Sequence, residues 1–231
     1  MTNSTYFFFI PFFLLFSAPA CSTDQNPTNI SNYENSGKQK DPYRILILGD
    51  SLTEGYGVME SEAYPTLLEH KLNQEISPKT KINYEIINGG LTGSTSSGGV
   101  SRISWFLKGN PDHLILALGG NDGLRGIPPK ETQKNLSKII QKARDKKIPV
   151  LLAGMKIPPN YGLKYTQEFA DLFFDLAKEN QVPLIPFLLE GVGGNPNYNL
   201  PDRIHPNATG HELICDLVFS HLSKELKSNH P

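Results

Sequence analysis

The sequence has few cysteines, no excess of one charge and no block of basic residues. Its two cysteines, Cys21 and Cys215, are far apart, and no cluster of Cys and His has the spacing of a zinc site. We therefore expect neither a disulfide framework nor a metal centre, and we predict that Cys215, in an apolar stretch, is a buried thiol. Lysine and arginine number 22 against 23 acidic residues, a net charge of −1 that gives no reason to expect a nucleic-acid partner.

Several motifs of large enzyme classes are also absent. The chain contains no Gly-x-Ser-x-Gly nucleophile elbow, no Walker A loop and no Gly-x-Gly-x-x-Gly fingerprint. These absences disfavour an elbow-type α/β-hydrolase, a P-loop nucleotidase and a dinucleotide-dependent enzyme. The segment HELIC, at 211–215, begins like the His-Glu-x-x-His zinc motif, but Cys215 stands where the second His is required.

One long apolar run is present, FFFIPFFLLFSAPA at residues 7–20, and it is short for a membrane span. The run ends in small residues, which is typical of a cleavable secretory signal, although no Lys or Arg precedes it. Cys21 follows directly and resembles the lipidated cysteine of bacterial lipoproteins. The two alternatives are lipidation of Cys21 and simple cleavage after Ala20, and both export the protein.

Residues 21–43 are rich in Ser, Asn, Thr and Gln and offer little to bury. We therefore predict a signal peptide at 1–20 and a flexible polar tether at 21–43. About 190 residues remain, enough for one domain with a sizeable core, which we place at 44–228. Lipidation of Cys21 would associate that domain with a membrane, as a cell-envelope lipoprotein; simple cleavage would leave it periplasmic or secreted.

Short apolar runs alternate with longer amphipathic stretches in this domain, a pattern typical of β-α units that build a parallel sheet with helices on both faces. We expect five strands, at residues 44–49, 82–87, 113–118, 149–154 and 183–187. The main helices are expected at residues 62–75, 96–108, 131–147, 164–180 and 208–227. Gly-rich polar segments follow the first three strands, at the edge where open parallel sheets bind ligands. The predicted fold class is α/β, a three-layer sandwich.

The stretch ILILGDSLTEGYGV, at residues 45–58, places Ser51 directly after the first predicted strand. Gly, Asp and Ser also form turns and cap helices, so the stretch alone leaves two interpretations open, an ordinary turn or a nucleophile. A hydroxyl becomes a good nucleophile only when a nearby base removes its proton. The choice between the two interpretations therefore depends on the histidines.

His205 has the context of a catalytic base. It lies in PDRIHPN, at 201–207, three residues after Asp202 and directly before the last predicted helix. Asp202 can accept the Nδ1 proton of His205, which leaves Nε2 free to take the Ser51 proton. Alternatively, Asp202 closes a turn and Asn207 caps the helix. The other histidines are expected in solvated, strand-initial, surface or capping positions: His70, His113, His211, His221 and His230.

Acyl transfer also needs donors for the oxyanion of the tetrahedral intermediate. The candidates are the N–H of Ser51, the N–H of Gly93 in NGGLTGSTSSGG, and the side-chain amide of Asn121. Gly93 as a turn residue and Asn121 as a loop hydrogen-bond partner are the alternatives. Three apolar side chains are predicted to border an acyl-binding groove, with ordinary loop packing as the alternative: Leu124, Ile127 and Tyr161.

Four blocks, GDSLTEGYG, the Gly of GLTGSTS, GGND and DRIHPN, occur in the order and spacing of the SGNH, or GDSL, hydrolase superfamily. GGNDGLRG, PPNYGLKY and VPLIPF further resemble the subgroup of periplasmic thioesterase I, lysophospholipase and arylesterase enzymes, and the resemblance covers 44–225. It implies a flavodoxin-like five-stranded parallel sheet, with Ser51, His205 and Asp202 as the triad and Ser51, Gly93 and Asn121 as the oxyanion hole. Asp50 and Asp122 match positions that are more often structural. Arg203, inside the catalytic block, is a departure of unknown effect on substrate choice.

The function expected from these observations is hydrolysis of a small acyl ester or thioester by a serine esterase, through an acyl-enzyme and without metal or organic cofactor. A carbohydrate acetylesterase on the same fold is the first alternative. A non-catalytic, surface-tethered binding module is the second, and the combined presence of Ser51, Asn121, Asp202 and His205 argues against it. The sequence indicates no oligomeric state.

Overall fold

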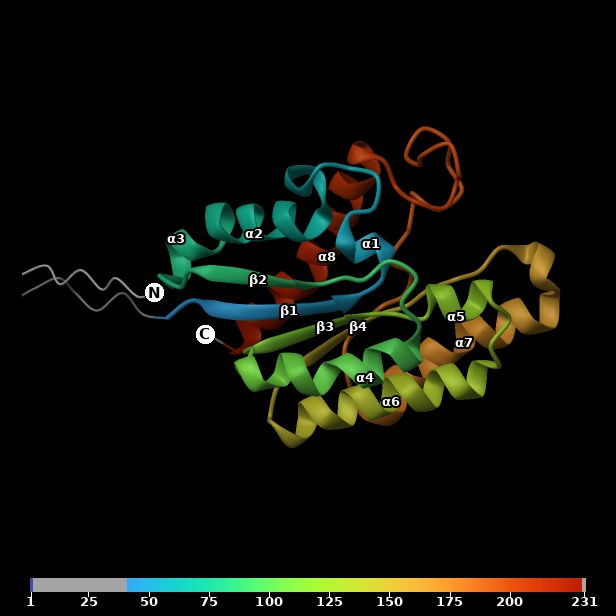
Figure 1. The fold of residues 1–231 in the computed structure, drawn as a ribbon, viewed down its shortest axis with the longest axis horizontal. Helices are drawn as coiled ribbons and strands as arrows, with labels where there is room; N and C mark the ends of the chain where they lie inside the picture. The colour runs from blue at the N-terminus through green and yellow to red at the C-terminus, as the bar shows by residue number, and fades with distance from the viewer. Residues whose placement is uncertain (2–40, 230–231) are drawn as a thin grey trace, which may run out of the picture. The chain divides into compact units, whose positions relative to one another are not determined.

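All five strands of the central sheet run parallel, in the order β2-β1-β3-β4-β5 (Figure 1). The computed structural model describes residue 1 and residues 41–229, and the side chains through residue 227. The predicted signal peptide, Cys21 and the tether up to residue 40 lie outside the described residues. From residue 41 onward the described chain forms one compact unit.

The central strands are buried on both faces, which is why they have continuous apolar runs rather than alternating ones, while the edge strand β2 is partly exposed and contains Glu85 and Asn88. The strands are β1 (Tyr43–Gly49), β2 (Tyr84–Gly89), β3 (His113–Ala117), β4 (Val150–Ala153) and β5 (Leu184–Ile185). In β1 the side chains of residues 45–48 have no exposed surface, and the same holds for residues 114–116 of β3. The predicted three-layer α/β sandwich is confirmed.

Helices cover the two faces in separate groups (Figure 1). One group is α2 (Tyr64–Glu75) and α8 (Ala208–Asn229), and the other is α4 (Ser96–Phe106), α6 (Pro129–Asp145) and α7 (Leu163–Asn180). The short elements are α1 (Ser51–Glu54), α3 (Ser77–Thr80), α5 (Gly120–Leu124), η1 (Glu60–Glu62), η2 (Leu107–Gly109) and η3 (Pro159–Tyr161). The predicted apolar face of residues 131–147 is buried, as its spacing requires: Leu136, Ile139, Ile140 and Ala143.

All five strands differ from their predicted bounds by one residue or more, and the differences at β2 and β5 have local causes. β2 begins at Tyr84 rather than residue 82 because the side chain of Asn73 bonds both the N–H and the C=O of Tyr84 and fixes the start of the strand. β5 has two residues instead of the predicted five, since Pro183 and Pro186 flank it and proline cannot donate to the ladder. β1 begins one residue earlier than predicted, at Tyr43.

The chain reverses its winding direction between β1 and β3. The connection after β1 leads outward to β2 on one side, and the connection after β3 leads to β4 on the other, while β1 and β3 are hydrogen-bonded neighbours. The loops that leave the ends of these two strands therefore separate and leave a crevice at the carboxyl edge. Among the helices of residues 41–229, none has the combined length and apolar character needed to span a bilayer.

Candidate functional site

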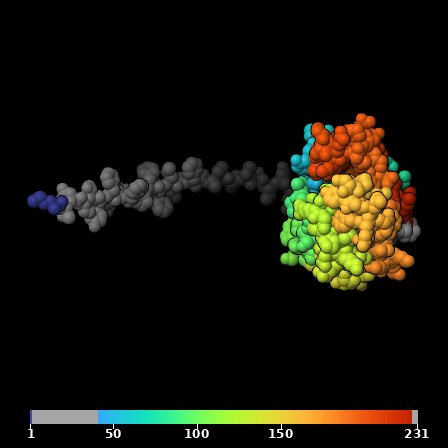
Figure 2. All heavy atoms as spheres, turned by 90° about the vertical axis from the view of Figure 1, so that its right-hand side faces the viewer, coloured from blue at the N-terminus to red at the C-terminus, as the bar shows by residue number. Residues whose placement is uncertain are grey.

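The predicted site residues come from four segments that leave the carboxyl ends of parallel strands, so the topology brings them to one edge of the sheet. These residues are Ser51 after β1, Gly93 after β2, Asn121 after β3 and His205 after β5. Figure 2 looks onto this edge, and its surface shows the gold segment near residue 160 next to the orange-red segment near residue 200. Ser51 follows β1 and Asn121 follows β3, so they flank the crevice at the switch point. A ligand site at this edge is what an open parallel sheet favours.

Ser51 is presented by a tight strand-to-helix turn. A Cβ on Gly49 would lie 1.9 Å from the Thr53 Oγ1, so the turn requires glycine there. Asp50 then caps α1, because its Oδ1 accepts the Leu52 N–H at 3.1 Å. Ser51 becomes the first helical residue, 7% exposed, with its Oγ 3.0 Å from the Nε2 of His205. Residues 49–51 therefore form the turn that the sequence suggested, and the same turn places the Ser51 hydroxyl at the crevice.

A closed loop before α8 carries His205 and Asp202. The Leu200 N–H donates to the His205 C=O at 2.7 Å, and Asn199 pairs with Pro206 in an isolated bridge. Asp202 Oδ2 lies 2.7 Å from His205 Nδ1, while its Oδ1 accepts the N–H groups of Ile204 and His205 at 2.9 and 3.0 Å. The aspartate therefore closes the turn and orients the imidazole at once.

The carboxylate of Asp202 is held in its charged form. Partial burial works against ionisation, but the N–H and side-chain hydrogen bonds from His205 and the N–H of Ile204 outweigh it and lower the Asp202 pKa to about 2. A charged carboxylate accepts the Nδ1 proton of His205 and thereby keeps Nε2 unprotonated. This is the tautomer that a base facing Ser51 requires.

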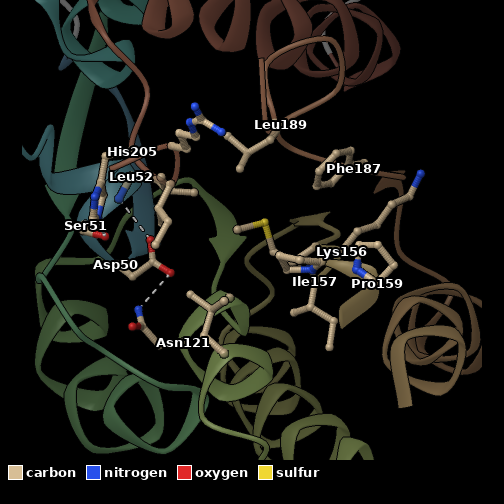
Figure 3. A pocket seen from close by; sticks show the side chains of 18 residues that line it. Asp50, Ser51, Leu52, Asn121, Lys156, Ile157, Pro159, Phe187, Leu189 and His205 are labelled. Carbon is tan, nitrogen blue, oxygen red and sulfur yellow. Dashed lines mark hydrogen bonds between the residues drawn. The ribbon is translucent and has the colours of Figure 1, made fainter. Parts of the chain in front are cut away.

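Asn121 faces the same crevice from the start of α5. Its Nδ2 donates to the Ser94 C=O at 3.1 Å and, at 3.4 Å, to Oδ2 of Asp50 (Figure 3). Asp50 is buried, and burial raises its pKa to about 6, partly opposed by the Leu52 N–H bond and by His205. Asp50 therefore caps α1 and positions the Asn121 amide.

Gly93 lies in a loop pinned beside α1. Its φ of 74° is in the left-handed region that favours glycine. Glu54 of α1 accepts the Thr92 N–H at 2.7 Å, and Arg125 donates to the Gly93 C=O at 2.9 Å. Close approach of this segment to α1 is possible because Gly90 has no side chain: a Cβ there would meet the Glu54 nitrogen at 2.1 Å.

A cavity of about 520 Å³ opens beside Ser51 and His205 (Figure 3). Its wall is mainly apolar, from residues that follow β1, β4 and β5 and from the His205 loop: Leu52, Met155, Ile157, Pro158, Pro159, Phe187, Leu189 and Ile204. Of the predicted groove residues, Leu124 lines the cavity; Ile127 and Tyr161 do not. Tyr161 instead donates its hydroxyl to the Leu124 C=O at 3.0 Å, and so supports the wall from behind.

Several residues at the site were not found from the sequence. The rings of Tyr56 and His205 lie with centroids 4.5 Å apart, which packs the imidazole from one side. Arg102 donates to the C=O groups of Gly49 and Gly89 and to the Ser94 hydroxyl, and so ties the ends of β1 and β2 to the Gly93 loop. The available indication was that Arg102 is the one charged residue among residues 96–106 of the predicted helix.

His211 corrects the expectation of a surface or capping role. It is fully buried, and its Nδ1 accepts the Tyr64 N–H at 3.2 Å, so it joins α8 to the start of α2. Burial lowers the His211 pKa to about 4. Cys215 is buried as predicted. In the described part of the chain, His, Cys, Asp and Glu side chains do not converge in threes as a metal site would need.

Comparison with known proteins agrees with this geometry. Residues 47–213 match the GDSL-like Lipase/Acylhydrolase family. The chain is 37% identical over 184 residues to an arylesterase of Vibrio mimicus, which covers 79% of this chain and 90% of that protein. It is 37% identical over 179 residues to thioesterase 1/protease 1/lysophospholipase L1 of Escherichia coli (strain K12), with coverages of 77% and 82%.

A solved structure gives the same relationship. The psychrotrophic esterase EstA from Pseudoalteromonas sp., in a structure inhibited by monoethylphosphonate, is 32% identical and has a TM-score of 0.74 over 80% of this chain and 99% of that one. The family match and the relatives above each span most of the chain from β1 to α8. The chain therefore belongs to the GDSL-like lipase/acylhydrolase family, and it is a hydrolase of ester bonds.

Proposed function

We propose that the protein is a serine esterase of acyl esters or thioesters, with Ser51 as nucleophile, His205 as base and Asp202 as the residue that orients the base. The observation that carries this proposal is the continuous hydrogen-bonded chain from Ser51 Oγ to His205 Nε2, at 3.0 Å, and from His205 Nδ1 to Asp202 Oδ2, at 2.7 Å. These contacts lie at a buried serine on the edge of an apolar cavity.

Hydrolysis then proceeds in two acyl-transfer steps. His205 takes the Ser51 proton as Oγ attacks the carbonyl carbon, and the resulting imidazolium gives that proton to the leaving oxygen or sulfur as its bond to the carbonyl carbon breaks. Water attacks the acyl-enzyme with His205 again as base, which releases the acid and restores Ser51. No step requires a metal or an organic cofactor.

The oxyanion is stabilised by the N–H groups of Ser51 and Gly93 and by the amide of Asn121. Ser51 is the first residue of α1, where backbone N–H groups have no partner within the helix. The bond from Asn121 Nδ2 to the Ser94 C=O, at 3.1 Å, orients the amide before substrate arrives. The second N–H of Nδ2, whose contact with Asp50 Oδ2 is long at 3.4 Å, is the one that the oxyanion takes over. Donors that are already in place cost no reorganisation during the reaction.

The cavity supports an acyl chain rather than a carbohydrate acetyl group. Its lining is mostly aliphatic and aromatic, with Leu52, Met155 and Phe187 among the wall residues, and its volume of about 520 Å³ exceeds that of an acetyl group. The relatives' names include arylesterase, thioesterase and lysophospholipase, which agree with an acyl substrate for those proteins.

A chain-length series tests this substrate assignment. For 4-nitrophenyl esters from acetate to octanoate, we expect kcat/KM to rise by roughly three- to fifteenfold per added pair of methylenes until the cavity is filled. The upper figure corresponds to full burial, since each fully buried methylene contributes about 0.8 kcal/mol. Acetylated xylose is the comparison substrate. Faster hydrolysis of the sugar acetate than of every acyl ester in the series would favour the carbohydrate acetylesterase instead.

We also propose that the protein is exported, with residues 1–20 as the signal, 21–43 as the tether and 44–228 as the hydrolase domain. Support comes from the apolar run at 7–20 and from Cys21 directly after its small residues. Mass spectrometry of the mature N-terminus is expected to find chain beginning at Cys21 with lipid attached. A mature chain with unmodified Cys21 would leave export by simple cleavage, and an intact Met1 would contradict export.

A further inference from the structure

Arg203 holds a backbone conformation that an arginine rarely adopts. Its φ is 59°, in the left-handed region that favours glycine. The conformation is imposed by the loop, because the Arg203 N–H donates to the Leu200 C=O at 2.9 Å while the Leu200 N–H bonds His205 across the same turn. A glycine would satisfy this turn without strain, so strain retained between Asp202 and His205 points to a use for the side chain.

Arg203 lines the cavity and is exposed, so water rather than a protein group solvates its charge. Within the described residues its guanidinium makes neither an ion pair nor a hydrogen bond. Asp50 is the only acidic residue among those that line the cavity, and its carboxylate is buried and already accepts bonds from Leu52 and Asn121. The cavity therefore offers a free cation to whatever enters it.

The position of Arg203 relative to the chemistry indicates which end of a substrate it meets. It lies two residues before His205, the group that protonates the leaving atom. Lys156, the other cation of the cavity lining, lies across the cavity from Ser51 and His205 (Figure 3), with its Nζ 5.0 Å from the centre of the Phe187 ring. Arg203 therefore shares a closed loop with the base that protonates the leaving atom, and both line the cavity, whereas Lys156 is on the far wall.

We propose that Arg203 is a specificity-determining residue that binds a phosphate or carboxylate carried by the leaving group of the ester. A planar guanidinium suits either anion, since both accept its paired N–H donors. This inference rests on the proposed function and narrows its substrate class to esters with an anionic leaving group.

A matched pair of esters tests the inference. The substrates are 4-butanoyloxybenzoate and its methyl ester, which present the same acyl group with a charged and a neutral leaving group. The two esters differ in intrinsic reactivity, and this difference is the same for every enzyme variant. The quantity to compare between variants is therefore the ratio of kcat/KM for the charged ester to kcat/KM for the neutral ester. We expect Arg203→Gln to lower this ratio about fivefold or more, mainly through KM, and salt to lower it in the wild type but not in the variant.

Lys156→Gln is the control, since it removes an equal charge from the other wall of the same cavity. The ratio is expected to stay within about twofold of the wild-type value in this variant. Arg203→Gly tests the strain argument separately. It should lower the ratio as Arg203→Gln does, because the guanidinium is gone. Its thermal stability should equal that of the wild type, because glycine adopts the positive φ of this turn without strain.

The outcomes separate the inference from the proposed function. An unchanged ratio in Arg203→Gln, or a loss in Lys156→Gln alone, would overturn the inference while hydrolysis of the neutral ester still supports an esterase. Failure of the wild type to cleave either ester would count against the proposed function itself. A second pair, 1-hexanoylglycerol and its 3-phosphate, distinguishes the two anions: an Arg203-dependent ratio in this pair assigns phosphate, and dependence in the benzoate pair alone assigns carboxylate.

Discussion

Ser51→Ala is expected to reduce turnover of an aryl butyrate by about 10⁵- to 10⁶-fold while the protein stays folded. Its Oγ is the atom 3.0 Å from His205 Nε2, and no other atom of the side chain can form the acyl-enzyme. The loss should fall on kcat, because the apolar cavity that binds the acyl chain is left intact. Steady-state kinetics with circular dichroism as the check on folding measure both parts of this expectation.

Covalent labelling distinguishes a lost nucleophile from a distorted site. A fluorophosphonate should label the wild type at Ser51, identified by peptide mass spectrometry, and should not label Ser51→Ala. Ser101→Ala, in an exposed serine of α4 whose hydroxyl bonds only the Ser97 C=O, is the matched control and should label and turn over like the wild type. Undiminished activity of folded Ser51→Ala would refute the nucleophile assignment, and an unlabelled, inactive wild type would favour the binding module.

The elements that carry the fold could be predicted because each has one dominant local cause. The apolar residues 45–48 and 114–116 have to be buried on both faces, and the spacing of Leu136 and Ile139 leaves only one face of α6 for the core. Bounds were less predictable where a single contact from elsewhere sets them, as when Asn73 fixes the start of β2.

The site residues were also predictable only in part: those within one short motif could be found from the sequence, and those that depend on loop conformation could not. Asp202 and His205 lie three residues apart in one loop, and the structure places Asp202 in contact with His205 and His205 in contact with Ser51. The cavity wall was predicted poorly because it depends on side-chain direction in loops. Tyr161 is close in sequence to lining residues such as Pro159, yet its hydroxyl points to the Leu124 C=O.

Convergence of the loops depends on contacts that no single motif contains. Arg102 bonds the C=O groups at the ends of β1 and β2, and Glu54 holds the Thr92 N–H beside α1. Both bring the Gly93 loop toward Ser51. A motif read along the chain identifies which groups are present, whereas their distances are determined by these bonds between elements.

Asp202→Asn is expected to reduce kcat by about 10³- to 10⁴-fold with little change in KM. The wild-type carboxylate accepts the Nδ1 proton of His205 at 2.7 Å. An Asn side chain can keep its oxygen on the N–H groups of Ile204 and His205 and then turns its NH₂ toward Nδ1, where it donates. The imidazole proton moves to Nε2, which can no longer accept the proton of Ser51.

Acid stability gives a second readout for the same variant, with the sign set by the lowered Asp202 pKa of about 2. A carboxyl whose pKa is lower in the folded protein stabilises the fold above its ordinary pKa, and that contribution is lost as the pH falls toward 2. The wild type should therefore lose more stability than Asp202→Asn over this acid range.

Asp112→Asn is the control for the kinetic prediction. It alters a carboxylate that accepts the Arg44 N–H at the opposite edge of the sheet, and it should leave kcat near the wild-type value. Full activity of folded Asp202→Asn would show that His205 is oriented without this carboxylate.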